Sequence, residues 1–319
     1  MKQNQARISV VLPVYNGAAC VHEAIESIQD QTYPHWEMII LDDGSSDNSY
    51  VICQGLAGGD DRIQVVRNPT NWGLAKSMNR LVALAQGEFV AVQEQDDISI
   101  PERFEREVDL LDRRQEVGLV SGIAAWMDED GQVFAHFPDL LARGGQYPQD
   151  RQQMVKYLYV EQCKVVNAAC MFRRSAAEQI PGPYDEEARM SIDWQFFIHL
   201  AHRWMIMGIP EYLVLMRRGK SHQHLSAMKE LQFREARRCI QKIYTLYHAD
   251  PGSPLNRVSF RKAMATQLIL EARYYGRLSG ASRLAKAIYY DPANPQTWKT
   301  FGELGRRMLG RPKNRPDLY

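Results

Sequence analysis

Short apolar runs alternate with amphipathic stretches along the first 120 or so residues of the chain. The runs at 8–12, 36–41, 63–66 and 89–92 are almost continuously apolar, which is typical of strands covered on both faces. Between them, apolar side chains recur at the three- and four-residue spacing of amphipathic helices, as in Val21, Ile25 and Ile28, in Leu74, Met78 and Leu81, and in Phe104, Val108 and Leu111. This alternation predicts an α/β fold with a doubly wound, mainly parallel sheet flanked by helices, whose ligand crevice lies at the carboxyl ends of the strands.

The pattern changes twice after this region. Residues 126–159 look irregular, with a hairpin turn at 128–131, before a strand candidate at 168–172 and a helix at 193–202. Beyond residue 226 the periodicity is helical, over 229–247, 260–278 and 281–290. We therefore predict one domain over 1–226 and a helical C-terminal region over 227–319.

Composition and charge exclude several classes of protein. The 319 residues carry a formal net charge of +1, so we expect no nucleic-acid partner. Five scattered cysteines without a CxxC pair disfavour both a disulfide framework and a zinc site, and they fit a reducing cytoplasm. The chain reaches its first strand without room for a signal peptide, and no apolar run approaches the ~20 residues of a spanning helix. We expect a cytoplasmic protein.

Three carboxylates crowd the exit of the strand predicted at 89–92. Glu94, Asp96 and Asp97 would repel one another if all were ionised, unless a divalent cation or the donor groups of a ligand offset their charge. Hard oxygen ligands suit Mg²⁺ or Mn²⁺, and these ions usually complete their shell with the phosphates of a substrate. The cluster predicts a metal-bound diphosphate at a strand end.

Four ordered segments resemble glycosyltransferase family 2: 9–16 (SVVLPVYN), 41–47 (LDDGSSD), 71–79 (NWGLAKSMN) and 95–97 continuing to Pro101. The resemblance covers roughly residues 7–226. It implies a GT-A fold, a nucleoside-diphosphate-sugar donor with UDP as the expected nucleotide, a divalent metal and inversion at the anomeric carbon. It also implies a nucleotide-binding half over about 1–125 and an acceptor half over about 126–226.

The resemblance assigns a donor site to the first strand ends. Pro13 and Tyr15 would lie beside the base, and the Asp43 carboxylate would accept a hydrogen bond from the imide N–H of uracil. The alternative interpretation is that Asp42, Asp43 and Ser45 form only a turn and a helix cap, where Asp and Ser are common.

The middle segments carry further donor contacts. Lys76 and Asn79 would approach the nucleotide, although Lys76 also fits a solvated helix start. In the acidic motif, typically Asp-x-Asp, Asp96 holds the metal position. Glu94 stands where the first Asp contacts the ribose or the metal shell, and Gln95 lies between them as a further donor contact. Glu94 is longer than Asp, so the contact geometry would differ.

Two further acids have a catalytic and a structural interpretation each. Asp97 would support the motif or start the helix that contains Phe104, because carboxylates favour helix N-termini. Asp193 matches the base that would deprotonate an acceptor hydroxyl, with Ile192 where the family commonly has Glu. Its structural alternative is an N-cap.

A basic segment follows near the end of the resemblance. Arg217 and Arg218 would stabilise the departing diphosphate, and His222 is a candidate metal ligand, with an exposed basic loop as the alternative. Trp194 and Trp204 are candidates for stacking on a sugar, with packing in the core as their alternative.

The acceptor expected from the resemblance is a glycan or a lipid-linked saccharide of bacterial surface polysaccharide synthesis. Two other classes stay open: a sugar-phosphate nucleotidyltransferase, for which residues 17–20 lack the Gly-rich signature, and a non-catalytic nucleotide- or glycan-binding module. The basic stretch 306–315 suggests peripheral membrane contact or a solvated tail, and the C-terminal helices suggest packing on the catalytic domain or an oligomer contact.

Overall fold

The computed structural model describes residues 6–128, 130–162, 164–218, 228–275 and 277–308, and it divides into two compact units. The first unit comprises Met1–Met154 and Lys164–Ala227, and the second comprises Val155–Cys163 and Met228–Tyr319. Each unit contains its own cluster of buried apolar side chains. The domain limits drawn from the sequence stay a prediction.

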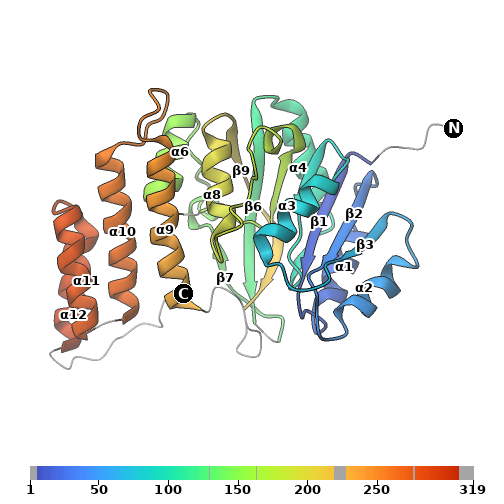
Figure 1. Cartoon of the computed structure of the whole chain (residues 1–319), viewed down its shortest axis with the longest axis horizontal. Helices are drawn as coiled ribbons and strands as arrows, with labels where there is room; N and C mark the ends of the chain where they lie inside the picture. Colours follow the sequence, from blue (N-terminus) through green and yellow to red (C-terminus); the bar gives the residue numbers. More distant parts are fainter. Residues whose placement is uncertain (1–5, 129, 163, 219–227, 276, 309–319) are drawn as a thin grey trace. The chain divides into compact units, whose positions relative to one another are not determined.

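The first unit is built on one sheet with the strand order β3-β2-β1-β4-β8-β6-β9-β5, and β7 pairs with β6 (Figure 1). The strands are β1 (Ile8–Val14), β2 (Trp36–Asp42), β3 (Ile63–Arg67), β4 (Phe89–Val92), β5 (Asp97–Ser99), β6 (Val117–Met127), β7 (Val133–Phe137), β8 (Cys170–Arg173) and β9 (Met205–Arg217). Among these described strands, β1, β2, β3, β4, β6 and β9 run in one direction, and β5, β7 and β8 run against them. The predicted mainly parallel α/β sheet is confirmed.

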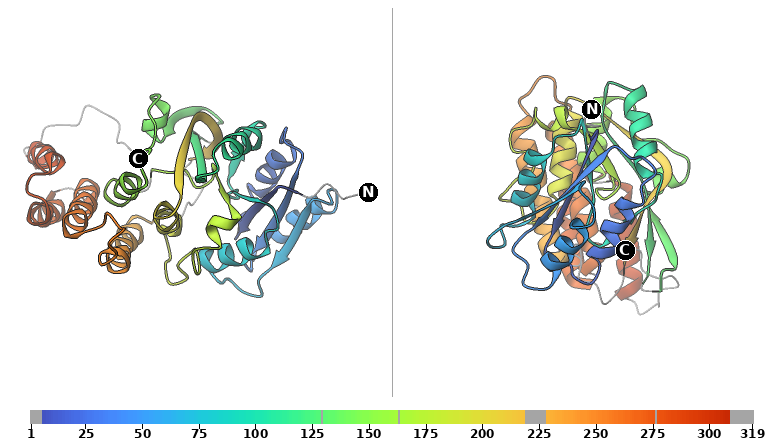
Figure 2. Two further views of the ribbon diagram at one scale, coloured as in Figure 1. Left: turned by 90° about the horizontal axis from the view of Figure 1, so that it is seen from above. Right: turned by 90° about the vertical axis from the view of Figure 1, so that its right-hand side faces the viewer.

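Helices cover both faces of this sheet (Figure 2). The helices of the first unit are α1 (Val21–Gln29), α2 (Ser49–Ala57), α3 (Leu74–Leu84), α4 (Arg103–Arg113), α5 (Asp139–Ala142), α7 (Arg174–Ala177) and α8 (Ile192–Ala201), and α6 (Arg151–Val160) begins in it. On β1, Ile8, Val10 and Leu12 point into one cluster with residues of α1, α2 and α4, whereas the Ser9 hydroxyl, on the opposite face, accepts hydrogen bonds from the backbone after α3.

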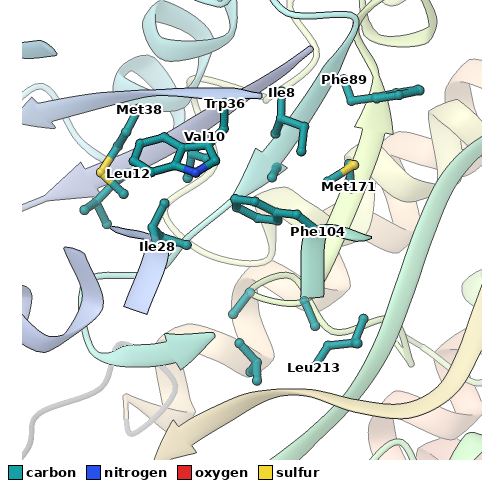
Figure 3. Close-up of a cluster of buried hydrophobic side chains, with 14 of the residues drawn as sticks. Ile8, Val10, Leu12, Ile28, Trp36, Met38, Phe89, Phe104, Met171 and Leu213 are labelled. Atoms are coloured by element: carbon teal, nitrogen blue, oxygen red, sulfur yellow. The ribbon is translucent and has the colours of Figure 1, made fainter. Parts of the chain in front are cut away.

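The core explains why the apolar runs of the sequence are continuous. Trp36, Phe89 and Phe104 are fully or almost fully buried, and Figure 3 shows Phe104 amid the side chains of Ile8, Ile28 and Leu213. Because both faces of the central strands are covered, successive residues on β1 and β4 are buried whichever way they point.

Register brings three strand ends to one edge of the sheet. Val14 of β1 pairs with Asp42 of β2, and Val11 of β1 pairs with Val92, the last residue of β4. Because β4 ends three residues before β1, the acidic segment after β4 lies alongside the end of β1. The predicted gathering of polar segments at the carboxyl ends follows from this register.

The second unit consists of helices in its described residues. They are α9 (Lys229–Tyr247), α10 (Arg257–Tyr275), α11 (Arg277–Tyr290) and α12 (Pro295–Met308), together with the part of α6 from Val155 onward. Its apolar cluster consists of Leu268, Ile269, Ala272, Leu284, Ala287 and Leu304. None of the described helices combines the length and the apolar composition that crossing a membrane requires.

Candidate active site

A buried glutamine shapes the loop that carries the acidic cluster. Gln93 is fully buried, and its Nε2 donates hydrogen bonds to the backbone oxygens of Glu94 (3.1 Å) and Asp97 (2.7 Å). Its Oε1 accepts a hydrogen bond from the Ser99 hydroxyl at 2.7 Å. These bonds fix both ends of the turn between β4 and β5.

Arg103 stabilises the same loop through its buried side chain. Its guanidinium is fully buried and donates to the carbonyl oxygens of Val92 (2.9 Å) and Cys170 (3.1 Å), which joins the end of β4 to β8. Glu107, one turn further along α4, forms the ion pair that balances its charge at 3.2 Å. Burial raises the pKa of Glu107 to about 7, although Arg103 acts in the opposite direction.

The three carboxylates after β4 converge as the sequence predicts. Glu94, Asp96 and Asp97 each offer one oxygen, and these oxygens lie within 4.8 Å of one another. Burial, followed by the charge of Asp96, raises the pKa of Glu94 to about 7, and burial with the charges of Glu94 and Asp96 raises that of Asp97 well above its usual value. Asp97 is buried, and among the described residues neither of its oxygens has a hydrogen bond of ordinary geometry, although the backbone N–H of Arg217 is near enough to lower its pKa.

This donor set fits a hard divalent cation. Three carboxylate oxygens are the ligand type that Mg²⁺ and Mn²⁺ prefer, and buried oxygens without donors are costly unless something positive meets them. Each of the three acids lies within five residues of the end of β4, so the buried Gln93 and Arg103 fix the backbone of the whole cluster.

The structural alternative for Asp97 is wrong. Asp97 does not start a helix: it begins β5, and α4 starts six residues later at Arg103 with Glu102 at its N-cap. Asp97 pairs in register with Met216 of β9, so β9 holds it inside the sheet. The sequence analysis assigned Asp97 a supporting role, and the structure brings it into the candidate metal set.

Asp193 approaches the same cluster from α8. Its charge contributes to the raised pKa of Glu94, so the two carboxylates are close enough to interact. The N-cap alternative for Asp193 is wrong, because Ser191 occupies the N-cap with φ 58° and ψ 32°, and Asp193 lies in the first helical turn. Asn167 donates from Nδ2 to the Oε1 of Glu94 at 2.9 Å and orients that carboxylate.

The end of β1 is tied to the acidic loop through Gln95. The backbone N–H of Tyr15 donates to Gln95 Oε1 at 2.9 Å, and Gln95 Nε2 donates to the Tyr15 carbonyl at 3.3 Å. The Tyr15 side chain is exposed, whereas Pro13 lies within β1, paired with Leu41. Pro13 and Tyr15 therefore lie at the carboxyl end of β1, where the resemblance places the nucleotide base. Gln95 bonds to the loop that follows β1.

Asp43 shapes the neighbouring loop. Its Oδ1 accepts from Asn68 Nδ2 at 2.6 Å and from the Trp72 N–H at 2.9 Å, and its Oδ2 accepts from the Gly73 N–H at 2.9 Å. A carboxylate offers about four acceptor sites, so one remains for a donor such as an imide.

The structure agrees in part with the alternative that Asp42, Asp43 and Ser45 form a turn and a helix cap. Asp42 accepts from the Ser45 N–H at 3.2 Å, which is a turn contact. The helix-cap part is wrong, because the N-cap of α2 is Asn48.

The two candidates on α3 have different surroundings. Lys76 is exposed. The Asn79 side chain exchanges hydrogen bonds with the backbone of Tyr184, at 2.9 and 3.0 Å, and donates to Glu186 at 3.1 Å. Asn79 thus joins α3 to the segment before α8, a contact that the sequence did not predict, and its contact with the nucleotide stays a prediction.

The two arginines at the end of β9 have different partners. Arg217 forms an ion pair with Glu23 of α1. The backbone N–H of Arg218 donates to the Met127 carbonyl at 2.8 Å, and its charge lowers the pKa values of Glu94 and Asp97, which places it beside the acidic cluster. His222, the candidate metal ligand, lies outside the described residues.

Asn167 is a site residue that the sequence analysis missed. It lies 73 positions after Glu94, in a segment without periodicity, just before β8. No local pattern marks it, because Asn is common at the ends of strands, and its partner follows only from the pairing of β8 with β4.

Comparisons with known proteins agree with this geometry. The family model described as glycosyl transferase family 2 matches residues 9–181, more than half of the chain. A protein of Bacillus subtilis (strain 168) named as a glycosyltransferase, EpsE, is 34% identical over 145 residues, which are 43% of this chain and 52% of that relative, so the chain aligns with about half of it.

Solved structures share the fold. S. aureus TarS 1–349 in complex with UDP-GlcNAc superposes with a TM-score of 0.65 at 16% identity, covering 94% of this chain and 81% of that one. The mannosyltransferase PcManGT from Pyrobaculum calidifontis, in complex with GDP-Man and Mn²⁺, has a TM-score of 0.58 at 18% identity, covering 96% and 86%. With the sheet, the strand-end acids and the family match in agreement, this chain belongs to glycosyltransferase family 2.

Proposed function

We propose that the protein transfers a sugar, with inversion, from a nucleoside-diphosphate donor to a hydroxyl of a saccharide acceptor, and that this transfer requires Mn²⁺ or Mg²⁺. The observation that carries the proposal is the convergence of Glu94, Asp96 and Asp97, with Asp193 close enough to perturb Glu94. The solved complexes support a nucleotide-sugar donor, since TarS was crystallised with UDP-GlcNAc and the mannosyltransferase with GDP-Man and Mn²⁺.

Each group has a distinct role in this proposal. Asp96, Glu94 and Asp97 would hold the cation, which when bound neutralises the charge of the diphosphate. Arg218 adds a fixed positive charge beside the cluster and stabilises the diphosphate as it leaves. Asp193 accepts the proton of the acceptor hydroxyl, because a neutral hydroxyl is a weak nucleophile.

The donor base would occupy the edge formed by β1 and β2. Tyr15 offers an exposed ring there, and Asp43 keeps one acceptor site after holding the loop that precedes α3. Lys76 is an exposed cation on the same helix and would pair with the nucleotide. We take UDP as the nucleotide, because an imide N–H is the donor that Asp43 can still accept.

The test is nucleotide-sugar turnover with matched acid variants. Native protein, Asp96→Ala, Asp193→Asn and the surface control Asp139→Asn are incubated with UDP-Glc, UDP-GlcNAc, UDP-Gal and GDP-Man with and without Mn²⁺. Release of the nucleotide and the melting temperature are then measured. We expect Asp193→Asn to keep UDP binding and to lose roughly 10²–10⁴-fold in turnover, and Asp96→Ala to lose Mn²⁺-dependent UDP binding.

Two outcomes would contradict the proposal. If no nucleotide raises the melting temperature of the native protein, the proposed donor site is wrong. Binding of UDP without turnover of any donor, unchanged in Asp193→Asn, would favour the non-catalytic binding module. Unchanged melting and turnover of Asp139→Asn, an exposed acid on α5, would show that loss of surface charge alone is not responsible for the effects.

The finer expectations on partners and place belong to the same proposal. We propose a glycan or lipid-linked saccharide acceptor of bacterial surface polysaccharide synthesis, and a cytoplasmic protein that touches the inner face of the membrane through its basic C-terminus. Most of 306–315 lies outside the described residues. On the described part of α12, Trp298 and Phe301 are 53% and 57% exposed. Sedimentation with vesicles of anionic and of neutral lipid tests this contact.

A further inference from the structure

Strand register aligns an aromatic residue with the acidic cluster. Asp97 of β5 pairs with Met216 of β9, and Met216 pairs with Trp126 of β6. Residues in register on neighbouring strands point to the same face of a sheet, so Asp97 and Trp126 share one face two strand spacings apart, about 10 Å. Trp126 is therefore a neighbour of the candidate metal site.

Arg218 is close both to Trp126 and to the acidic cluster. Its guanidinium carbon lies 5.5 Å from the centroid of the Trp126 ring, while its charge lowers the pKa values of Glu94 and Asp97. The arginine proposed to face the leaving diphosphate thus also contacts the indole. A group bound against Trp126 would lie next to the reacting centre.

A bulge adds a second ring. On β7, Ala135 pairs with Trp126 and Val133 pairs with Met127, so Phe134 is an extra residue without a partner on β6. Bulges turn a side chain away from the regular alternation and recur beside active sites. The Phe134 ring is 51% exposed and packs edge-on against Trp126, with ring centroids 6.4 Å apart and an interplanar angle of 60°.

Trp126 also carries a hydrogen-bond donor that lacks a partner. Its indole Nε1 is buried, and no described residue accepts a hydrogen bond from it. Buried indole N–H groups usually have an acceptor, and a hydroxyl oxygen is a suitable one. An apolar ring face, an exposed second ring and an unsatisfied N–H together are the groups that recognise a pyranose, which presents C–H bonds on its faces and hydroxyls at its edges.

We propose that Trp126 and Phe134 form the subsite that binds a pyranose ring of the acceptor saccharide. This inference rests on the proposed glycosyltransferase function. It assigns the rings to the acceptor because Trp126 lies on β6, separated by β8 from β4, whereas the expected base site lies at β1 and β2. Trp194, the sequence candidate for sugar stacking, is 2% exposed and cannot offer a ring face.

The test is saccharide binding to the full chain in the presence of Mn²⁺ and UDP. The probes are the methyl α- and β-pyranosides of glucose, galactose, mannose and N-acetylglucosamine, observed by saturation-transfer NMR. The variants are Phe134→Ala, Trp126→Phe, which keeps an aromatic ring but removes the indole N–H, and the control Val133→Ala, a neighbour on β7 that is 58% exposed. Because Phe134 and Val133 are both surface residues, neither change should unfold the chain.

We expect saturation transfer to at least one pyranoside, lowered five-fold or more in Phe134→Ala, lowered about two- to five-fold in Trp126→Phe and unchanged in Val133→Ala. Absence of transfer to every pyranoside, or equal transfer in Phe134→Ala and Val133→Ala, overturns the subsite.

Thermal shift by UDP and Mn²⁺ in the same samples separates the two proposals. If the nucleotide stabilises every variant equally while no pyranoside binds, the subsite fails and the proposed function stands. If the nucleotide stabilises none of them, including the native chain, the proposed function fails. If Phe134→Ala loses nucleotide binding, the rings belong to the donor and the acceptor assignment is overturned.

Discussion

Glu94 stands where the family motif typically has Asp, and its surroundings in the structure raise its pKa. It lies among three acids and accepts a hydrogen bond from Asn167, and its pKa is raised to about 7 by burial and by Asp96. A carboxylate with this pKa exchanges its proton near neutral pH. The residue therefore couples the occupancy of the candidate metal site to pH.

We predict that Mn²⁺ affinity rises with pH through 7. Only the ionised carboxylate binds the cation, and a raised pKa means that protons compete with the metal below pH 7. One proton released per ion gives an affinity about tenfold lower at pH 6 than at pH 8. Isothermal titration of Mn²⁺ at four pH values measures this. Glu94→Gln should bind more weakly with a flatter profile, and an equally steep profile in that variant would contradict the assignment to Glu94.

Asn167 should act through Glu94. Its Nδ2–H bonds to the charged form, so Asn167→Ala should raise the pKa of Glu94 further and move the Mn²⁺ profile to higher pH. Loss of a hydrogen bond to a charged group costs about 1.5–3 kcal/mol, which corresponds to roughly 10- to 100-fold in Mn²⁺ affinity at pH 7. Asn167→Asp places a like charge beside Glu94, which should also raise its pKa and move the Mn²⁺ profile to higher pH. If both variants titrate like the native chain, Asn167 has no positioning role.

At the scale of elements, the loop between β2 and α2 packs its backbone closely against the loop between β3 and α3. Gly44 has φ +70°, and a Cβ there would meet the Thr70 carbonyl carbon at 2.5 Å and the Asn71 nitrogen at 2.8 Å. This approach lets Asp43 reach the N–H groups of Trp72 and Gly73. The glycine is therefore part of how the expected base site is built.

We predict that Gly44→Ala weakens UDP binding as well as folding. Gly131, in the turn between β6 and β7, is the matched control, because its φ is +76° and a Cβ there would meet nothing within 4 Å. Both changes pay the left-handed backbone strain of about 1–2 kcal/mol, and only Gly44→Ala adds a backbone clash. Urea unfolding and UDP titration measure the difference. Equal effects of the two substitutions would contradict the packing argument.

The buried pair on α4 supports the acidic loop. Glu107→Ala would leave the guanidinium of Arg103 charged and fully buried without its carboxylate, and removing one partner of such a pair costs about 3–5 kcal/mol. Asp109→Ala on the same helix removes only an exposed pair with Arg113 and should change the free energy of unfolding by less than about 1 kcal/mol. Urea denaturation of both variants compares the two costs, and a mild effect in Glu107→Ala would show that water or another group compensates Arg103.

Some elements follow from sequence, and others depend on tertiary pairing. The strands β1, β2 and β4 are buried on both faces, and helices such as α9 (Lys229–Tyr247) repeat their apolar positions regularly, so local pattern suffices. The edge strand β3 is only partly buried, contrary to the expectation that both faces of 63–66 are covered. The long strands β6 and β9 pair with register shifts, and the sequence did not predict them as strands. β9 also mixes exposed with buried positions. The three-residue β5 exists only because β9 pairs with it.

The candidate site divides in the same way. Glu94 and Asp96 were predictable because they follow an apolar strand, and the carboxyl ends of parallel strands meet at one edge. Asp97 was given only a supporting role or a helix start, because its pairing with Met216 involves a residue 119 positions later. Contacts such as Asn167 with Glu94 and Arg218 with Trp126 likewise arise from strands brought together by the fold, which no local pattern encodes.

At the scale of the whole molecule, the described residues form two units with separate interiors. In the second unit, the nearly buried Glu271 pairs with Arg237 and with Arg283, at 3.2 Å for the latter, beside the apolar cluster of α10, α11 and α12. In the first unit, the proposed donor and metal sites lie at one edge of the sheet. A ligand of the first unit and a core mutation in the second unit should therefore each change the stability of one unit.

We predict two thermal transitions in calorimetry. UDP with Mn²⁺ at about 100 times the dissociation constant adds about 2.7 kcal/mol to the stability of the folded first unit and should raise its transition by roughly 5–10 °C. Glu271→Ala, which leaves two arginines without their buried partner, should lower only the transition of the second unit. If one transition responds to both the ligand and the mutation by the same amount, the two interiors unfold as a single cooperative body. Their separate clusters would then describe packing and not independent stability.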